Sequence, residues 1–413
     1  MAKRHESVTG GRRDGWGEMV LMGSVERYPF WAGAGEIAPE FVRRLRAAPL
    51  DAVELPSGDR AWLAVRYDDV AEVLASRAFT RNLTYPGAPR VAADFDVSDL
   101  PGAILNLDPP EHTRVRRLVA GAFTPRLVER QRPRIRAVCG ELLDGLANPA
   151  DLIDAFAFPM PMVVICEMLG VPRTDLDRFR DWSSAYVSLS AHPLEERVAA
   201  LEQLQEYARE MIRRRRAAPG DGLLDALIRA RDEEDRLSED ELVLMTFSLI
   251  VAGHEATTAA LSRGVFRLLV TGRYADLADD PGRVPAAVEE ILRHDPPADA
   301  AFLRVATEDV RLPSGRVRAG EAVLAVTSAA NRDPAKFDRP DVFDIARPTA
   351  DHLAFGRGPH YCLGASLARA ELQIALAELV TRFPRLRLAV PPGSIEWRTG
   401  SLMLGPTTLP VEH

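Results

Sequence analysis

Cysteine is scarce in this chain of 413 residues, which has only Cys139, Cys166 and Cys362. No two of them lie close in the sequence, which excludes a redox or zinc motif built on Cys-x-x-Cys. An odd and sparse set of cysteines is typical of proteins from a reducing compartment. We interpret the stretches around Cys139 and Cys166 as helices, where a buried cysteine is an ordinary small apolar residue. Cys362 differs, because glycines surround it.

The chain also has no N-terminal secretory signal, no excess of positive charge and no apolar run long enough to cross a membrane. Its longest apolar stretch, residues 242–253, is interrupted by Thr246 and Ser248 and falls short of the roughly 18 residues that a span requires. The net charge of −8 argues against binding to nucleic acid or to an anionic membrane surface. We therefore expect a cytoplasmic monomer with no nucleic-acid or membrane partner.

The domain organisation that the sequence predicts is simple. A chain of this length could hold two or three domains, but no internal repeat or long low-complexity linker divides it. We expect a flexible Gly- and Arg-rich tail over residues 1–25, followed by a single domain over residues 26–413.

The predicted fold is mainly α with a minor β part. Residues 51–66 predict a β-hairpin, and residues 82–106 predict a long loop of the kind that often binds ligands. Residues 110–270 are nearly all helix, and they end in a helix of roughly 32 residues that a capping box at Ser238 begins. The middle of this helix is apolar all round, so it should cross the core. Further predicted elements are strands near 310–326, a coil over 331–351, a last helix from Ala365 and a hairpin over 397–411.

The most specific signal is the segment Phe355-Gly-Arg-Gly-Pro-His-Tyr-Cys-Leu-Gly364. Three glycines and a proline in ten residues predict a tight, fixed loop. Cys362 comes just before a predicted helix, where the dipole and the free N–H groups favour a thiolate. One possibility is that Cys362 is a nucleophile with His360 as its base. A zinc site would need three more ligands. Haem iron needs only one axial thiolate.

This segment resembles the haem-binding signature of the cytochrome P450 family, Phe-x-x-Gly-x-His/Arg-x-Cys-x-Gly, at every defined position. The resemblance covers nearly the whole chain from about Tyr28, and it is to the soluble bacterial members of the biosynthetic tailoring type. It implies haem b as cofactor, Cys362 as the proximal ligand of its iron, and a long central helix over the haem. It also implies that Phe355, Gly356 and Gly364 surround the sulfur and that His360 points at a haem propionate.

A second pair of residues supports the resemblance. Glu290 and Arg293 lie at positions i and i+3 of a predicted helix, where they can bond on one face. Such a pair alone would be an ordinary surface ion pair. It is similar to the family's Glu-x-x-Arg motif, which implies a structural role with Arg347 as third partner.

Two further cations are candidates for binding the propionates. His112 and Arg116 lie one turn apart on the same face of a predicted helix, and together they could bind an anion. A solvated basic face is the alternative for this segment taken alone. The resemblance implies that both residues bind haem propionates, as does Arg304.

The sequence Ala-Gly-His-Glu-Ala-Thr-Thr, residues 252–258, lies midway along the long helix. An acid there is costly unless it has a partner or a task. The segment resembles the family's Ala/Gly-Gly-x-Asp/Glu-Thr motif, which implies that the helix opens beside the haem and that Glu255 relays protons. A Glu255 that is merely bonded to a basic neighbour is the alternative.

The family's threonine is absent, because position 256 is Ala256. Thr257 follows it, but the next residue on a helix points about 100° away and cannot simply substitute. We therefore expect that water or a group on the substrate assists proton delivery. The other possibility is a reaction that inserts no oxygen, such as oxidative coupling or desaturation.

Small side chains line one face of the same helix at Ser248, Ala252 and Ala256. Either a flat macrocycle with its substrate or a neighbouring helix could lie against them. By resemblance, the other walls of the substrate pocket are Leu105, Ala300, Ala301, Leu402 and Met403.

The function that these signals predict is a haem–thiolate monooxygenase acting on a small molecule of secondary metabolism. It would use O2 and two electrons from NAD(P)H, delivered by a ferredoxin reductase and a ferredoxin. Candidate docking charges on the face around Cys362 are Arg114, Arg117, Arg357 and Arg369. The alternatives are an oxidase that couples or desaturates its substrate and, in another class, a haem-binding sensor without turnover.

Overall fold

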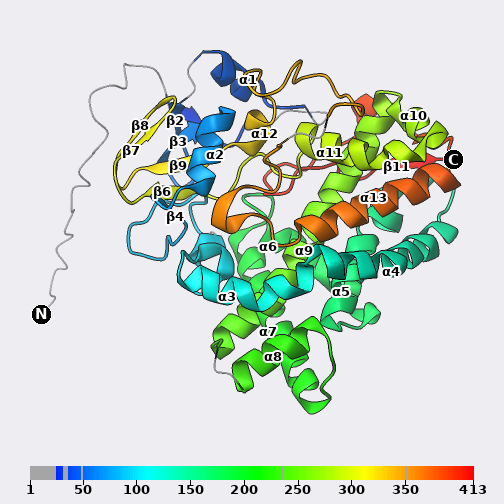
Figure 1. Cartoon of the computed structure of the whole chain (residues 1–413), viewed down its shortest axis with the longest axis horizontal. Helices are drawn as coiled ribbons and strands as arrows, with labels where there is room; N and C mark the ends of the chain where they lie inside the picture. Colours follow the sequence, from blue (N-terminus) through cyan, green and yellow to red (C-terminus); the bar gives the residue numbers. More distant parts are fainter. Residues whose placement is uncertain (1–24, 31–35, 48–49, 96, 234–235, 349–350) are drawn as a thin grey trace, which may run out of the picture.

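The computed structural model describes residues 25–30, 36–47, 50–95, 97–233, 236–348 and 351–413. The predicted tail over residues 1–25 lies outside this part of the chain, apart from Val25. Within the described residues, most strands lie together on one side next to a few helices, whereas the C-terminal strand lies on the opposite side among the remaining helices (Figure 1). The predicted class, mainly α with a minor β part, is confirmed.

The main sheet has the strand order β1-β2-β3-β9-β6-β4. The predicted hairpin over residues 51–66 is present as antiparallel β2 and β3, and the turn closes with a 2.8 Å hydrogen bond from the Leu55 N–H to the Asp59 carbonyl. Smaller sheets pair β7 with β8, and β10 with β11 and β5. The strands are β1 Glu26–Arg27, β2 Leu50–Glu54, β3 Arg60–Ala64, β4 Phe79–Thr80, β5 Ala150–Asp151, β6 Arg304–Ala306, β7 Val310–Leu312, β8 Gly315–Val317, β9 Ala322–Ala325, β10 Arg387–Leu388 and β11 Pro410–Glu412.

The predicted hairpin over 397–411 is only partly present. Trp397 and Pro406 form an isolated antiparallel bridge, but β11 pairs with β10 and with β5. The partner in β5 lies some 260 positions earlier in the chain, and no local sequence pattern indicates such a pairing.

The helical part follows the prediction closely. The loop over residues 82–106 is present, with two short 3-10 turns at Val97–Asp99 and Ile104–Asn106. The helices are α1 Pro39–Arg46, α2 Tyr67–Ala75, α3 Glu111–Ala120, α4 Pro125–Asp144, α5 Pro159–Leu169, α6 Leu176–Tyr186, α7 Leu194–Ala217, α8 Leu223–Asp232, α9 Glu239–Val270, α10 Arg273–Asp279, α11 Val284–His294, α12 Thr327–Ala330 and α13 Ala365–Arg382.

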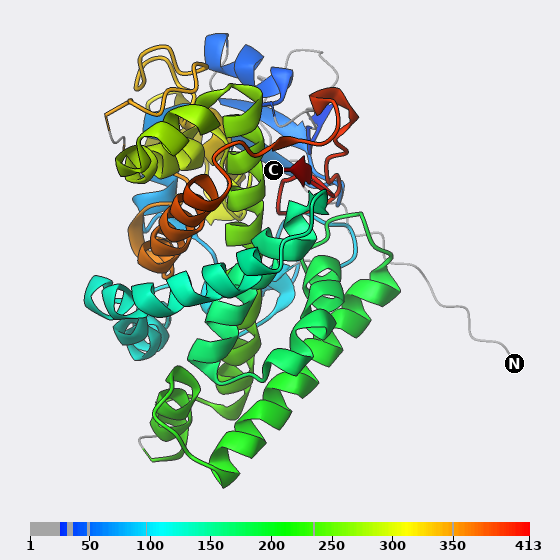
Figure 2. The same ribbon diagram turned by 90° about the vertical axis from the view of Figure 1, so that its right-hand side faces the viewer.

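Helix α9 is the core helix of the molecule. It begins with the predicted capping box, in which the Glu241 N–H donates to Ser238 Oγ and the Ser238 N–H donates to a Glu241 carboxylate oxygen. It packs against α5, α7 and α13, and the side view shows it running through the helical part (Figure 2). By length and composition α9 could cross a membrane, but most of its apolar window is buried inside the protein.

The helix runs unbroken through Gly253, although the sequence suggested that it opens there. A Cβ atom at Gly253 would lie 2.6 Å from Ile165 Cγ1 of α5, far inside a van der Waals contact. The glycine is therefore explained by the close approach of α5 to α9.

Candidate active site

The segment from Phe355 to Gly364, here called the Cys loop, leads directly into α13. The Cys362 N–H donates to the Phe355 carbonyl at 2.9 Å, which closes the loop. Gly356 and Gly358 hold φ angles of +69° and +73°, which favour glycine. A Cβ atom at Gly358 would also lie 2.6 Å from the carbonyl oxygen of Leu74 on α2. Both the backbone conformation and the close packing against α2 therefore explain why this loop contains glycines.

Cys362 is exposed, whereas Cys139 and Cys166 are buried. Burial raises the pKa of both of the latter thiols to about 12, in line with their interpretation as core residues. Dense protein around Cys362 also raises its pKa, while the Gly364 N–H and the charges of Arg116 and Arg369 lower it only in part.

The Gly364 N–H near the start of α13 therefore favours the thiolate, in line with the sequence, but desolvation outweighs its effect on the pKa. A metal cation deprotonates a coordinating thiol outright, so the setting of Cys362 fits a metal ligand. Among the residues that the structure describes, no cluster of three or more His, Cys, Asp or Glu side chains could hold a metal ion. A zinc site is thus not supported, and a single axial thiolate fits.

An ion-pair cluster braces the Cys loop from the side of α11. The Arg369 guanidinium lies 4.4 Å from the centre of the Phe355 ring and donates to both oxygens of Glu289, at 2.7 and 3.0 Å. His352 contacts the same carboxylate at 3.1 Å. Although burial opposes ionisation, these two partners lower the pKa of Glu289 to about 2. The loop is therefore held in place by Glu289, a residue that no sequence motif identifies.

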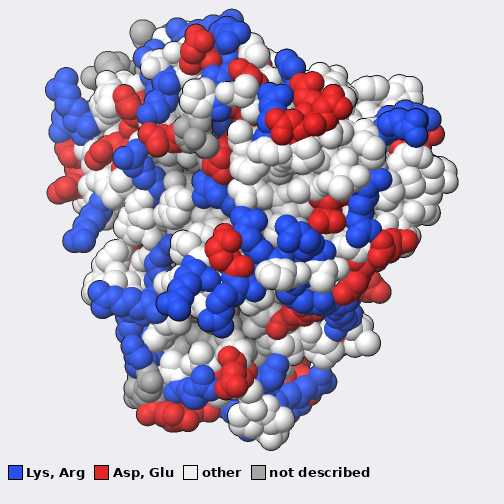
Figure 3. All heavy atoms as spheres, turned by 45° about the vertical axis from the view of Figure 1, so that its right-hand side comes forward, with Lys and Arg blue, Asp and Glu red and all other residues white. Residues whose placement is uncertain are grey.

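The candidate docking charges fall into two groups. Arg369 is part of the brace just described, and Arg114 bonds to Glu241 and to the Arg236 carbonyl, so neither is a free surface charge. Arg117 and Arg357 are exposed. Figure 3 shows Lys and Arg side chains gathered across the middle of one face of the molecule, with acidic side chains between them.

The predicted propionate residues come together beside the Cys loop. The rings of His112 and His360 have centroids 4.3 Å apart, and Arg116 donates to the Tyr361 carbonyl at 2.6 Å. Arg304 Nε and His360 Nε2 are buried and have no hydrogen-bond partner in the described part of the chain.

Burial disfavours the charged forms of two residues of this cluster. It lowers the pKa of Arg304 to about 10, and burial beside Arg304 and His112 lowers the pKa of His360 to about 2. Asp108 offsets part of the charge at Arg304. Buried donors that lack enough negative charge around them are stabilised by an anion. They fit the two carboxylates that haem carries.

Arg81 is a residue of this region that the sequence reasoning missed. Its side chain is fully buried and donates to the carbonyl oxygens of Leu105 and Leu303 and to the side chain of Asn106. It thereby ties the loop over 82–106 to the segment that enters β6. An arginine next to a short strand carries no local sign of such a role.

The stripe of small side chains on α9 is accessible. Between Leu242 and Leu268 every residue of α9 is buried except Ser248, Ala252, Gly253 and Ala256. Gly253 lies against α5, so the other three form the accessible face. A neighbouring helix would bury this stripe, so the structure favours a ligand surface over helix packing.

Glu255 is buried on α9 next to this stripe, between two basic groups. Its carboxylate lies 3.3 Å from His254 Nε2 and 3.8 Å from Arg398 Nη1. Burial opposes ionisation, but the contact with His254 and the charge of Arg398 lower the pKa of Glu255 overall. The acid therefore has partners, as the alternative interpretation expected, and it still adjoins the stripe.

Thr257 faces away from the stripe, as the helical geometry predicted. It is buried and lies near Glu371 of α13, without a good hydrogen bond between the two side chains. It offers no hydroxyl on the accessible face, where Ala256 stands.

The predicted pocket walls are only partly brought together. Ala300, Ala301, Leu402 and Met403 line one hollow of about 90 Å³. Leu105, Ser248, Ala252 and Ala256 are not among its walls. The same hollow is lined by residues that the sequence reasoning missed, among them Tyr28, Phe95, Tyr186, Arg197 and Phe302.

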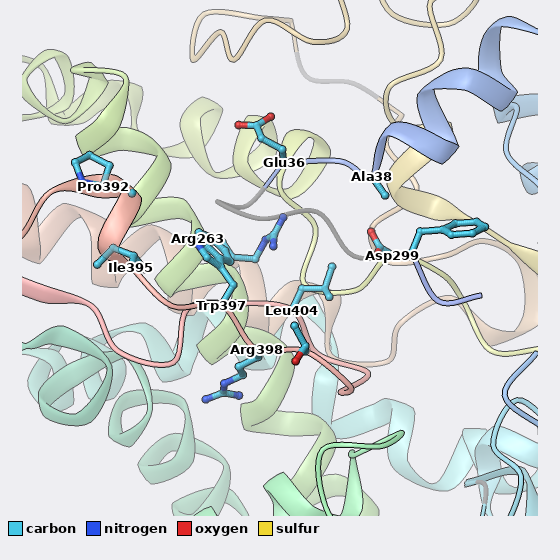
Figure 4. A pocket seen from close by; sticks show the side chains of 13 residues that line it. Glu36, Ala38, Arg263, Asp299, Pro392, Ile395, Trp397, Arg398 and Leu404 are labelled. Carbon is cyan, nitrogen blue, oxygen red and sulfur yellow. The ribbon is translucent and has the colours of Figure 1, made fainter. Parts of the chain in front are cut away.

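A larger hollow of about 470 Å³ is lined in part by residues of the C-terminal segment, among them Pro392, Trp397 and Arg398 (Figure 4). Arg263, Asp299, Trp397, Arg398 and Leu404 are among its walls, and none of the predicted site residues is. Arg398 links it to Glu255. It contains none of the predicted pocket walls, whereas the hollow of about 90 Å³ contains four of them. The site of chemistry is assigned to the Cys loop.

The predicted structural triad is assembled as one buried unit. Arg293 donates to both oxygens of Glu290, each at 2.8 Å, and Arg347 Nε lies 3.2 Å from the same carboxylate. Arg293 also donates to the carbonyl oxygens of Asn331 and Pro340 on the coil that precedes the Cys loop. These contacts anchor that coil to α11.

The chain is similar to known proteins over almost its whole length. The family model described as cytochrome P450 matches residues 283–408, which include the Cys loop. Nocardicin C N-oxygenase of Nocardia uniformis subsp. tsuyamanensis is 46% identical over 392 residues, covering 93% of this chain and 98% of the relative. Mycinamicin IV hydroxylase/epoxidase of Micromonospora griseorubida is 44% identical over 390 residues, with the same coverage of 93% and 98%.

Among solved structures, cytochrome P450mel 107F1, described as having biaryl coupling reactivity, superposes with a TM-score of 0.88 at 37% identity. The match covers 94% of this chain and all of that one. The named relatives are enzymes of secondary metabolism, and the matches to them span almost the whole chain. These matches show that the chain, with its exposed Cys362 and the buried basic cluster beside it, belongs to the cytochrome P450 family, as a soluble bacterial haem monooxygenase of the biosynthetic tailoring type.

Proposed function

We propose that this enzyme oxidises a small-molecule natural product with O2 and two electrons, in the cytoplasm, as a monomer whose single catalytic domain spans residues 26–413. The observation that carries the proposal is the exposed Cys362 at the start of α13. Haem b, when bound, supplies oxygen activation, and a thiolate ligand favours O–O cleavage.

The geometry supports a specific set of residues for holding the haem. Cys362 is the metal ligand, and the Gly364 N–H that lowers its pKa supports the thiolate. Phe355 and Gly356 shape the loop around the sulfur, and Ala252 offers the accessible face of α9. The four propionate donors would be His112, Arg116, Arg304 and His360. Of these, the buried Arg304 Nε and His360 Nε2 would gain the acceptors that they lack.

Electrons would come from NAD(P)H through a ferredoxin reductase and a ferredoxin. An acidic donor would be attracted to a basic face. Arg117 and Arg357 are the exposed candidates near the Cys loop, because Arg114 and Arg369 already have acidic partners.

Glu255 is the proposed proton relay. It is a buried acid next to the accessible stripe, and Arg398 connects it to the larger hollow, which offers a route for water. Ala256 has no hydroxyl, and the hydroxyl of Thr257 does not lie on the accessible face of α9. The last proton donor would therefore be a water molecule or a polar group of the substrate. This assignment gives a task to an acid that is buried in the mainly apolar middle of α9.

A second candidate is oxidative coupling or desaturation without oxygen insertion. Ala256 favours it, because such reactions have less need of a hydroxyl that delivers protons. The relative with biaryl coupling reactivity shows that a structure of this shape supports that chemistry in another protein. A sensor without turnover is disfavoured, because Glu255 and the accessible stripe would have no purpose in it.

Turnover under ¹⁸O2 separates these candidates. A product that carries one ¹⁸O atom per molecule supports the monooxygenase. A product that has lost two hydrogen atoms and carries no label supports coupling or desaturation. Folded, reducible, haem-loaded protein that oxidises none of a broad panel of natural products would contradict both.

A further inference from the structure

The hollow of about 90 Å³ has a distinctive lining. Its walls come from the loop over 82–106, the connection between α6 and α7, the segment that enters β6, and the C-terminal loop around Leu402. The walls are mostly apolar, and four of them are aromatic: Tyr28, Phe95, Tyr186 and Phe302. The Phe95 and Tyr186 rings lie 6.4 Å apart and Tyr186 also packs against Phe247, which fixes two of these rings. Such a lining fits a flat aromatic group.

Arg197 is the charged exception in this lining. It lies in the first turn of α7, and its side chain is only 3% exposed. Nη1 donates to Asp94 at 2.8 Å and Nη2 donates to the Phe95 carbonyl. Nε is buried without a hydrogen-bond partner in the described part of the chain. An unpaired buried donor is unfavourable, so an acceptor on a ligand would stabilise it.

The ion pair between Arg197 and its partner Asp94 is weak. The Asp94 side chain is 39% exposed, so water screens its charge. A carboxylate enclosed in the hollow would be screened less and could bond to Nε and a neighbouring nitrogen together, the bidentate geometry that arginine favours. Binding would then compete with Asp94 for the guanidinium.

The same competition would widen the pocket. A hollow of about 90 Å³ is well below the roughly 300–1,000 Å³ of sites for drug-sized ligands. The contact between Asp94 and Arg197 joins two of its walls, the loop over 82–106 and α7. A ligand that draws Arg197 away from Asp94 loosens this joint.

We propose that the substrate is an aromatic carboxylic acid, whose ring system packs among Phe95, Tyr186 and Phe302 and whose carboxylate binds Arg197. This inference rests on the proposed function, since it names the substrate class of the same enzyme. It makes Arg197 a specificity-determining residue and Asp94 its competitor.

The test is calorimetric titration of the haem-loaded protein with 2-naphthylacetic acid and, as a neutral match, 2-naphthylacetamide. Wild type should bind the acid at least tenfold more tightly than the amide. Asp94→Asn should strengthen binding of the acid severalfold and leave the amide unchanged, because it removes the competing charge. Arg197→Met should abolish the preference.

Arg209→Met is the matched control, since Arg209 lies on the same helix, is half exposed and contacts Glu206. It should leave both affinities unchanged. Equal binding of acid and amide by wild type would overturn the inference, as would the absence of a gain for the acid in Asp94→Asn. Neither result requires that the Arg197→Met variant folds.

A carbon monoxide spectrum of the same samples separates this result from the proposed function. A thiolate-type spectrum without acid preference overturns the substrate class alone. Arg197-dependent acid binding in a protein without that spectrum supports the pocket and overturns the oxygenase proposal.

Discussion

Replacing Arg293 by methionine should destabilise the protein severely. The Arg293 side chain is fully buried and donates two hydrogen bonds of 2.8 Å to Glu290. Three more reach the carbonyl oxygens of Asn331, Pro340 and Val342, at 2.8 to 3.3 Å. Methionine keeps the length and much of the apolar volume of the side chain but removes all five donations. The change therefore isolates the polar contribution.

The magnitude follows from what remains. Breaking one partner of a buried ion pair costs about 3–5 kcal/mol, because the other charge stays buried. Glu290 keeps the Asp344 N–H at 2.8 Å and Arg347 at 3.2 Å, which favours the low end. The three carbonyl oxygens also lose their donors, which works in the other direction. We expect a loss of about 4 kcal/mol, a large share of the 5–15 kcal/mol typical of a folded protein.

The assay is urea unfolding followed by far-ultraviolet circular dichroism, with Arg273→Met as the matched control. Arg273 forms an i, i+3 pair with Asp276 at 2.9 Å, but the two side chains are 49% and 36% exposed. The control should lose less than about 1 kcal/mol. Equal losses in the two variants, or a loss below about 1 kcal/mol for Arg293→Met, would refute the reasoning that burial sets the magnitude.

Three further predictions concern the Cys loop and α9. Ala256→Thr should not raise the amount of product formed per NADPH consumed, and a clear rise would contradict proton delivery by the substrate. Glu289→Gln should destabilise the protein at neutral pH by up to about 3 kcal/mol, since the folded-state pKa of about 2 lies below the usual 4.5. That difference is present above pH 4.5 and should shrink as the pH falls toward 2; a pH-independent difference in urea midpoints would contradict it. Gly358→Ala should lower the haem-to-protein ratio, because the new Cβ meets the Leu74 carbonyl and the positive φ costs about 1–2 kcal/mol; a wild-type ratio would show that the loop tolerates a side chain.

Local signals in the sequence predicted the parts of the fold and site that local physics determines. The capping box at Ser238 and the apolar middle of α9 are contained within one helix, so the sequence alone defines that helix. The Cys loop was equally clear, because positive φ angles and close packing leave glycine as the suitable residue at Gly358. The stripe of Ser248, Ala252 and Ala256 follows from the helical repeat.

Contacts between distant segments could not be predicted in this way. Arg369 looks like a surface arginine until Glu289 of α11 is placed beside it. Arg398 lies 143 positions after Glu255, and the clasp of Arg197 on Asp94 joins α7 to a loop about a hundred positions earlier. The pairing of β11 with β5 is of the same kind. In each case the chain brings together partners that no spacing rule connects.

The most direct test of thiolate ligation is the carbon monoxide difference spectrum of the reduced, haem-loaded protein. The long-wavelength Soret band of a thiolate-ligated haem is expected for wild type, and its loss is expected in folded Cys362→Ser. A spectrum of the histidine-ligated kind from well-folded wild type, or an unchanged spectrum in Cys362→Ser, would contradict the assignment of Cys362 as the iron ligand.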